Sequence, residues 1–242
     1  LRELGTPNLG IILKIETRRG FENLPELLFS AMASHAAGVM IARGDLGVEV
    51  PLSQVPSLQK MMIRKSYLAG KPSITATQML ESMIHNPRPT RAEVSDVANA
   101  IYDSTSAVML SGETAIGRYP IETVSVMRSI VEEAERDFSY RLFFEQHSTL
   151  IYHDVPSALT LAAVKTAYST DSKAILAFTS SGGTARLLSR LRPQMPIIAM
   201  TPIKKSYHQM ASNWGVIPYF KEATASIDDA FKKISEFALK QE

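Results

Sequence analysis

A short, unbroken apolar run constrains the fold of this chain most. It covers residues 39–42 (VMIA), and no polar residue interrupts it. Such a run is typical of a strand that is buried on both faces of a parallel sheet. The run ends abruptly at Arg43, Gly44 and Asp45. In α/β proteins the chemistry lies just past the carboxyl ends of such strands, so we predict that Asp45 is a metal ligand.

The first 140 residues repeat this strand-and-helix pattern four times. Thr90 and Glu93 have the spacing of a capping box, and Pro120 fits the first turn of a helix. The alternation predicts a parallel sheet, which is either open or the second half of a barrel, because four units cannot close eight strands. The predicted strands are 9–15, 39–42, 72–76 and 107–110, and the predicted helices are 24–33, 54–69, 90–102 and 120–138.

A smaller open α/β domain is predicted over residues 141–242. The segment 140–154 shows no clear periodicity, so we expect it to connect the two domains. Asp154 is then a candidate N-cap, with Pro156 in the first turn of the helix that follows. The predicted strands are 173–178, 196–200 and a short one near 216, and helices are expected from 183, from about 203 and over 227–238.

Composition excludes several classes of function. The net charge is only +2, from 26 basic and 24 acidic side chains, and no basic block stands out, so no nucleic acid partner is expected. There is no cysteine, which rules out disulfides and fits a reducing compartment. No apolar run approaches the roughly 18 residues that a membrane helix needs. The start resembles no signal peptide. The first residue is not methionine, so we expect a fragment.

Polar side chains at the ends of three predicted strands could form one site. Lys14 and Glu16 are two residues apart, so they leave the same face of the first strand. Asp45 follows the second strand and Thr77 follows the third. Two carboxylates with room for water suit magnesium, and a neighbouring lysine can stabilise negative charge on an enolate or a migrating phosphoryl group. Spacing alone does not choose between these two chemistries.

The local sequences around these residues resemble pyruvate kinase. They occur in the order and at the spacing of that family, and they are LKIE at 13–16, MIARGDLGVEVP at 40–51, ITATQMLESM at 74–83, NPRPTRAEVSDVANAI at 86–101 and AVMLSGETA at 107–115. The resemblance implies that residues 1–140 are strands five to eight of a TIM (β/α)8 barrel. It also implies that residues 141–242 are most of the C-terminal regulatory domain, without its last strand.

The resemblance implies a role for each candidate residue. Lys14 matches the lysine that stabilises the transition state, and Thr77 matches the hydroxyl beside the pyruvate moiety. Glu16 and Asp45 match the metal ligands. The implied substrate site comprises Lys14, Ala42, Gly44, Asp45 and Thr77. The family transfers the phosphoryl group of phosphoenolpyruvate to ADP, uses magnesium and usually potassium, is cytoplasmic, and usually assembles as a homotetramer.

The chain also departs from the family pattern. Leu13 stands where a small residue is usual, and residues 17–19 (TRR) replace a segment that usually begins with asparagine. The family's phosphate-binding arginine, its potassium ligands and its lid domain belong to earlier strands that these residues lack. Catalysis of this kind needs charges that are preorganised away from water. We therefore expect no activity from this polypeptide alone, although the intact protein would be active.

A loop in the second domain is a candidate phosphate site. It consists of Thr179, Ser180, Ser181, Gly182, Gly183 and Thr184. Amides and hydroxyls at a helix N-terminus can cradle a phosphate, although an ordinary N-cap turn explains the same residues. The resemblance favours binding of the phosphate of a sugar-phosphate effector. It is no P-loop, because no lysine follows the glycines.

Two alternatives come from other classes of function. A magnesium-dependent aldolase or lyase acting on pyruvate-like substrates also places a glutamate and an aspartate at successive strand ends. The segments TATQMLESM and NPRPTRAE argue against it. The other alternative is a non-enzymatic module that binds sugar phosphates, in which the first domain only supports the second.

Overall fold

A computed structural model of the chain describes residues 9–32, 36–148, 154–222 and 226–240. The chain divides into two compact units, Leu1–Phe138 and Ser139–Glu242. The division falls close to residue 140, where the sequence pattern changes. Each unit contains its own parallel sheet.

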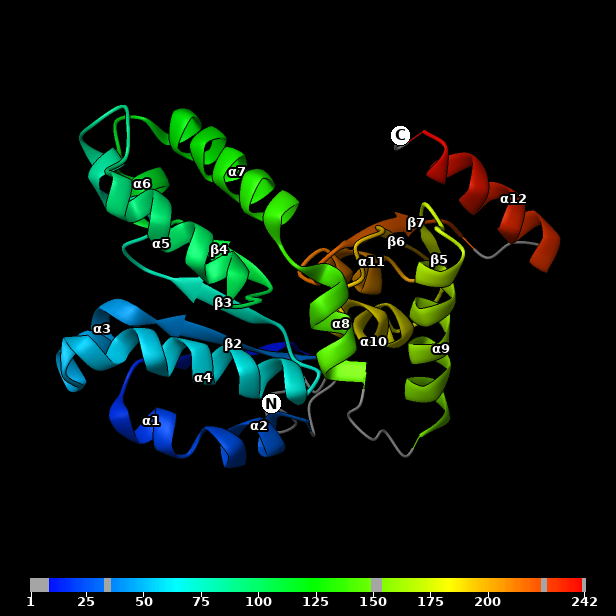
Figure 1. Ribbon diagram of the computed structural model, residues 1–242, viewed down its shortest axis with the longest axis horizontal. Helices are drawn as coiled ribbons and strands as arrows, with labels where there is room; N and C mark the ends of the chain where they lie inside the picture. Colours follow the sequence, from blue (N-terminus) through cyan, green and yellow to red (C-terminus); the bar gives the residue numbers. More distant parts are fainter. Residues whose placement is uncertain (1–8, 33–35, 149–153, 223–225, 241–242) are drawn as a thin grey trace. The chain divides into compact units, whose positions relative to one another are not determined.

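The first unit contains the predicted four-stranded parallel sheet, in the order β1-β2-β3-β4 (Figure 1). Its strands are β1 (Ile11–Ile15), β2 (Ala37–Ala42), β3 (Ser73–Ala76) and β4 (Ala107–Met109). Its helices are α1 (Arg18–Glu22), α2 (Leu24–Met32), α3 (Arg43–Glu49), α4 (Val55–Leu68), α5 (Arg91–Tyr102), α6 (Gly112–Ala115) and α7 (Pro120–Asp137), with 3-10 turns η1 (Leu52–Gln54) and η2 (Glu81–Ile84).

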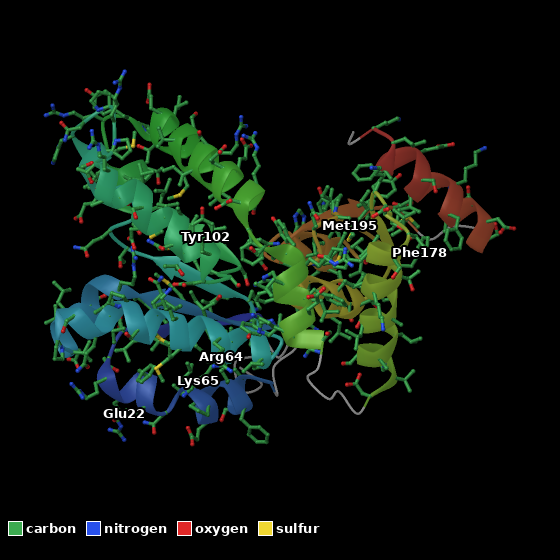
Figure 2. The ribbon with its side chains drawn as sticks, viewed as in Figure 1. Glu22, Arg64, Lys65, Tyr102, Phe178 and Met195 are labelled. Atoms are coloured by element: carbon green, nitrogen blue, oxygen red, sulfur yellow. The ribbon has the colours of Figure 1, made fainter. Side chains whose placement is uncertain are left out.

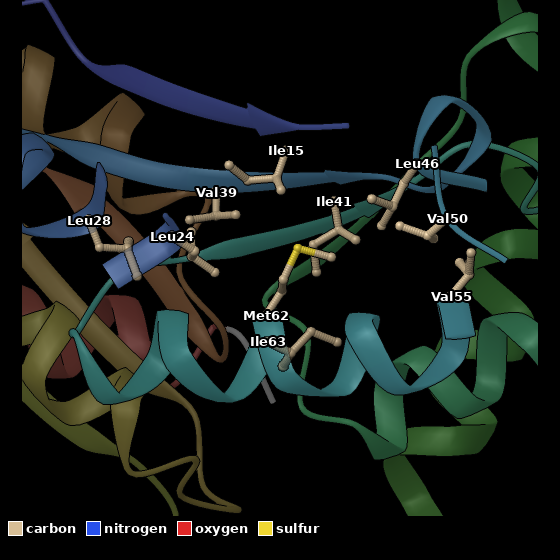
Figure 3. Close-up of a cluster of buried hydrophobic side chains, with 10 residues drawn as sticks. All are labelled: Ile15, Leu24, Leu28, Val39, Ile41, Leu46, Val50, Val55, Met62 and Ile63. Atoms are coloured by element: carbon tan, nitrogen blue, oxygen red, sulfur yellow. The ribbon is translucent and has the colours of Figure 1, made fainter. Parts of the chain in front are cut away.

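The core of this unit forms where α4 packs on β2 and β3. Val39 and Ile41 on β2 are fully buried, as the unbroken apolar run predicts. Met62 on α4 points toward these strands (Figure 3), and Ile63 belongs to the same buried cluster. Burial of each such side chain contributes roughly 1.5–3 kcal/mol relative to exposure, which fixes the strand that leads to Asp45.

Helix α4 also contacts the segment after β1. Lys65, which Figure 2 shows on α4, lies with its Nζ 5.5 Å from the centroid of the Phe21 ring on α1. A cation over an aromatic face is attracted by the ring quadrupole. Phe21 lies on α1, the short helix that begins two residues after Glu16.

The second unit contains a three-stranded parallel sheet in the order β5-β6-β7. Asp154 caps α9 as predicted, since its Oδ1 accepts a hydrogen bond of 2.8 Å from the amide of Ser157. The elements are β5 (Ile175–Phe178), β6 (Ile197–Thr201) and β7 (Val216–Phe220), with helices α8 (Tyr140–Ser148), α9 (Val155–Ser169), α10 (Gly183–Arg190), α11 (Lys204–Met210) and α12 (Ile227–Ala238).

The expected connection over 140–154 is wrong for its first nine residues, which form α8. Phe144 is the buried residue of this helix and packs with Val164 and Ile175 in the core of the second unit. One buried aromatic side chain anchors α8, so the sequence shows no long apolar stripe.

In the described part of the chain, no helix is long and apolar enough to cross a membrane.

Candidate functional site

Lys14, Glu16 and Asp45 meet at the carboxyl ends of β1 and β2. The strands are parallel, with Ile15 of β1 opposite Ile41 of β2, so both strands end at the same edge of the sheet. Lys14 Nζ forms an ion pair with Glu16 Oε2 and lies 3.6 Å from Asp45 Oδ2. One ammonium group therefore contacts both carboxylates that the sequence singles out.

The charges of this cluster reinforce one another. The hydrogen bond with Glu16, together with the negative charge of Asp45, raises the pKa of the Lys14 ammonium group above its usual range. Lys14 therefore stays positively charged at neutral pH. Asp45 lies in the first turn of α3, where a negative charge interacts favourably with the helix, and its side chain is 65% exposed.

The two carboxylates fit a divalent metal that takes its other ligands from outside the protein. Glu16 Oε2 is shielded from solvent and has no hydrogen-bond partner apart from its ion pair with Lys14. Such an oxygen is well suited to a cation. Among the described residues, no group of three or more histidine or acidic side chains could hold a metal. A metal here would need water or substrate oxygens as well, which is the usual arrangement for magnesium.

The hydroxyl group of Thr77 contacts the segment that follows β2. Thr77 Oγ1 accepts a hydrogen bond of 2.8 Å from the amide of Gly44 and donates one of 2.6 Å to the carbonyl of Ala76. The φ angle of Thr77 is 71°, in the left-handed region that β-branched residues rarely adopt. Ala42, the N-cap residue of α3, is fully buried. The structure thus joins Thr77 to Gly44, the residue before Asp45.

Arg43 lies between the predicted site residues, and no role for it was predicted from the sequence. Its side chain is only 9% exposed. The guanidinium group bonds to Asp96, to Gln59 and to backbone carbonyls at the end of β3 and just after it. An arginine directly after a fully apolar strand is a signal that could have identified it, because a charge so close to the core needs partners.

Glu113, for which the sequence predicts no role, is a second buried group near the strand ends. It is 3% exposed, and its carboxylate accepts hydrogen bonds from the amides of Leu80 and Ser111, at 3.2 Å and 2.7 Å. It therefore ties the segment after β3 to the exit of β4.

The candidate phosphate loop of the second unit lies between β5 and α10. Thr179 Oγ1 accepts a hydrogen bond of 3.0 Å from the amide of Gly182. Gly182 has a φ of 79° and is the N-cap residue of α10. An added Cβ there would lie 3.0 Å from Met210 Cγ, so glycine is needed both for its conformation and for space. These contacts account for the turn without a ligand, and they leave the first-turn amides of α10 without a side-chain cap.

Comparison with known proteins gives the same family along most of the chain. The family described as pyruvate kinase, barrel domain, matches residues 1–124, and pyruvate kinase, alpha/beta domain, matches residues 157–242. A pyruvate kinase of Chlamydia muridarum is 51% identical over 221 residues, which are 90% of this chain and 45% of that protein. One from Clostridium acetobutylicum is 43% identical over 239 residues, 99% of this chain and 50% of that protein.

A solved structure agrees with these matches. The crystal structure of a pyruvate kinase from Cryptosporidium parvum is similar with a TM-score of 0.90 at 38% sequence identity, covering 95% of this chain and 46% of that chain. The chain thus spans about half the length of the relatives that it matches. The matches do not favour the aldolase or the non-enzymatic alternative.

Proposed function

The chain belongs to the pyruvate kinase family, and from this premise we propose that it forms part of an enzyme that transfers the phosphoryl group of phosphoenolpyruvate to ADP. The products are pyruvate and ATP. The observation that carries the proposal is the contact of Lys14 with both Glu16 and Asp45 at the carboxyl edge of the first sheet. In α/β proteins this edge is where substrates bind.

Glu16 and Asp45 are the residues that we propose hold the divalent metal, which we take to be magnesium. The metal supplies positive charge that offsets the charge of the substrate phosphate. Lys14, held protonated by its acidic neighbours, stabilises negative charge on the phosphoryl group in the transition state. This assignment makes Lys14 both a substrate-binding and a catalytic residue.

Thr77 is proposed to act at the pyruvate end of the substrate, and Ala42 and Gly44 to line the site with their backbone. The amide of Gly44 donates to Thr77 Oγ1, so Gly44 also fixes the orientation of that hydroxyl. The shielded position of Ala42 supports a role in excluding water from this edge.

The remaining assignments follow from the family. We propose that residues 1–140 are the second half of the catalytic barrel and that 141–242 are a regulatory domain. We also propose a potassium requirement, a cytoplasmic location and a homotetramer. The open turn at the start of α10 supports a sugar-phosphate effector on residues 179–184.

Replacement of Lys14 in the full-length protein tests the proposed reaction. We expect Lys14→Met to lower kcat about 100- to 1,000-fold, the usual loss when a group that stabilises transition-state charge is removed. The measurement is pyruvate formed from phosphoenolpyruvate and ADP. Lys65→Met is the matched control, because Lys65 contacts Phe21 and not the acidic pair, and it should keep full activity. Unchanged turnover in Lys14→Met would refute the assignment.

A further inference from the structure

The side chain of Arg43 is turned into the protein from the middle of the proposed substrate-binding segment. We propose that Arg43 is a positioning residue, which holds the Thr77 turn and the Gly44 amide in the geometry that phosphoryl transfer requires. The contacts are independent of any reaction, whereas the benefit to catalysis rests on the proposed function. In the described part of the chain, Arg43 forms no hydrogen bond or ion pair with Lys14, Glu16 or Asp45, so it acts through Thr77.

The turn after β3 needs such support because its backbone is strained. Thr77 and Gln78 are consecutive non-glycine residues with φ angles of 71° and 54°. A β-branched residue in this region is a genuine outlier and persists only when its surroundings enforce the conformation. The geometry after β3 is therefore not one that the local sequence would adopt by itself.

Arg43 binds the strained backbone directly. Nη2 donates to the carbonyl oxygens of Thr77 at 2.7 Å and Gln78 at 3.4 Å, and Nε donates to that of Ala76 at 3.3 Å. One planar guanidinium thus engages three consecutive carbonyl groups. Lysine has a single nitrogen and could not form this fork.

The guanidinium is itself fixed by groups on two helices. Asp96 on α5 accepts from Nη1 through Oδ1 at 2.8 Å, with Oδ2 2.7 Å away, and Gln59 on α4 accepts at 3.2 Å. The Asp96 carboxylate offsets the cost of burying the positive charge. Arg43 therefore couples the turn after β3 to the rigid helices that cover the sheet.

Two adjacent residues, Arg43 and Gly44, bind the carbonyl and the hydroxyl group of Thr77. The Arg43 side chain binds the carbonyl oxygen of Thr77, while the Gly44 amide binds its hydroxyl oxygen at 2.8 Å. Loss of the Arg43 fork would let the turn relax, and the Gly44 amide would lose its acceptor. Hydrogen exchange at this amide therefore reports the positioning without any need for catalysis.

The test is residue-resolved hydrogen exchange on the full-length protein. The readout is the exchange rate of the Gly44 amide divided by that of the Val39 amide, which bonds to the carbonyl of Pro72 and reports general opening of the sheet. We expect this ratio to rise at least tenfold in Arg43→Lys. The control Lys60→Met breaks the ion pair with Asp103, the C-cap residue of α5, but it leaves the hydrogen bonds of Arg43 to the turn in place, so the ratio should stay unchanged.

A double variant separates positioning from a purely structural role. Thr77→Val removes the acceptor of the Gly44 amide and should raise the same ratio. If Arg43 acts through Thr77, adding Arg43→Lys to Thr77→Val raises the exchange ratio by less than a further twofold. An unchanged ratio in Arg43→Lys, or effects that multiply in the pair, would overturn the proposal. If Arg43→Lys fails to fold, Asp96→Asn replaces it, because that variant removes the counter-charge of Arg43. The exchange ratio should again rise, and an unchanged ratio would overturn the proposal.

Kinetics on the same proteins distinguish this proposal from the proposed function. We expect Arg43→Lys to lower kcat at least tenfold while KM for ADP changes less than twofold, and Lys60→Met to leave both unchanged. If the exchange ratio rises but the unaltered protein forms no pyruvate, the positioning stands and the proposed function fails. If the ratio rises and kcat stays unchanged in an active enzyme, the catalytic part of the inference is wrong.

Discussion

Thr77 has an unfavourable backbone conformation, and its hydroxyl group links the end of β3 to the segment just after β2. Its φ of 71° places it among the rare left-handed threonines, and its hydroxyl bonds to Gly44 and Ala76. Such strained residues cluster at functional sites, where surrounding contacts maintain them. The hydroxyl and the conformation can be separated by substitution.

We expect three substitutions of Thr77 to differ in stability. Thr77→Val keeps the strain and loses both hydrogen bonds, so unfolding should become easier by about 1–2 kcal/mol. Thr77→Gly loses the same bonds but relieves roughly 1–2 kcal/mol of strain, so its stability should lie near that of the unaltered protein. Thr77→Ser keeps the hydroxyl and is the control. Denaturant unfolding of the full-length protein gives the order, and a Gly variant less stable than Val would contradict it.

At the scale of elements, the carboxylate of Glu93 joins the start of α5 to the long segment after β3. It accepts hydrogen bonds from the amide of Thr90 at 2.7 Å and from the amide and hydroxyl of Ser82 at 2.7 Å and 2.6 Å. Partial burial acts to raise the pKa of this carboxyl group, but the hydrogen bonds from Ser82 and Thr90 outweigh it and hold the pKa below its usual value. The charged form is therefore the one that stabilises this region.

The sign of the pH dependence follows from that lowered pKa. The stabilisation is fully present above the unfolded pKa, near 4.5, and is lost as the pH falls through the lower folded value. At pH 7 we expect Glu93→Gln to lower the free energy of unfolding by about 1 kcal/mol, the usual loss of a helix cap. The difference from the unaltered protein should close as the pH falls through the lowered folded pKa of Glu93. Unfolding curves across this pH range give the result. Glu81→Gln, on an exposed residue of the same segment, is the control, and a gap independent of pH would argue against the assignment.

The same elements show what the sequence could predict. Thr90 and Glu93 were found because a capping box depends on residues three apart. Arg43 was not found, since its partners on β3, α4 and α5 are distant in the sequence and come together only in the fold. Helix α3 was missed for a related reason: it contains Gly44 and Gly47, which disfavour helix locally, and tertiary packing overrides that preference.

The candidate site shows the same limit. Lys14, Glu16 and Asp45 could be placed together because parallel strands end at a common edge. The left-handed turn at Thr77 could not be predicted, because threonine has no local preference for it. Phe144 is a further case, since a single buried aromatic residue gives no periodic signal for α8.

At the scale of the whole molecule, the first sheet ends in two edge strands. Within the described residues, β1 pairs only with β2, and β4 pairs only with β3. Ile12 on β1 is 52% exposed, so an apolar side chain accompanies the free backbone groups of this edge. Unprotected edges of this kind recruit further strands, either from the rest of a barrel or from another chain.

We therefore expect these 242 residues, when expressed alone, to associate as concentration rises and to form no pyruvate. Sedimentation velocity measures the association, and Ile12→Lys should weaken it because a charge on an edge strand opposes pairing. Ile121→Lys is the control, since Ile121 is 77% exposed on α7 and away from the edge strands. Under the proposal that residues 1–140 are the second half of a barrel, a separate polypeptide that carries the first half should compete with self-association. A chain that stays monomeric at every concentration would show that these edges are protected in another way.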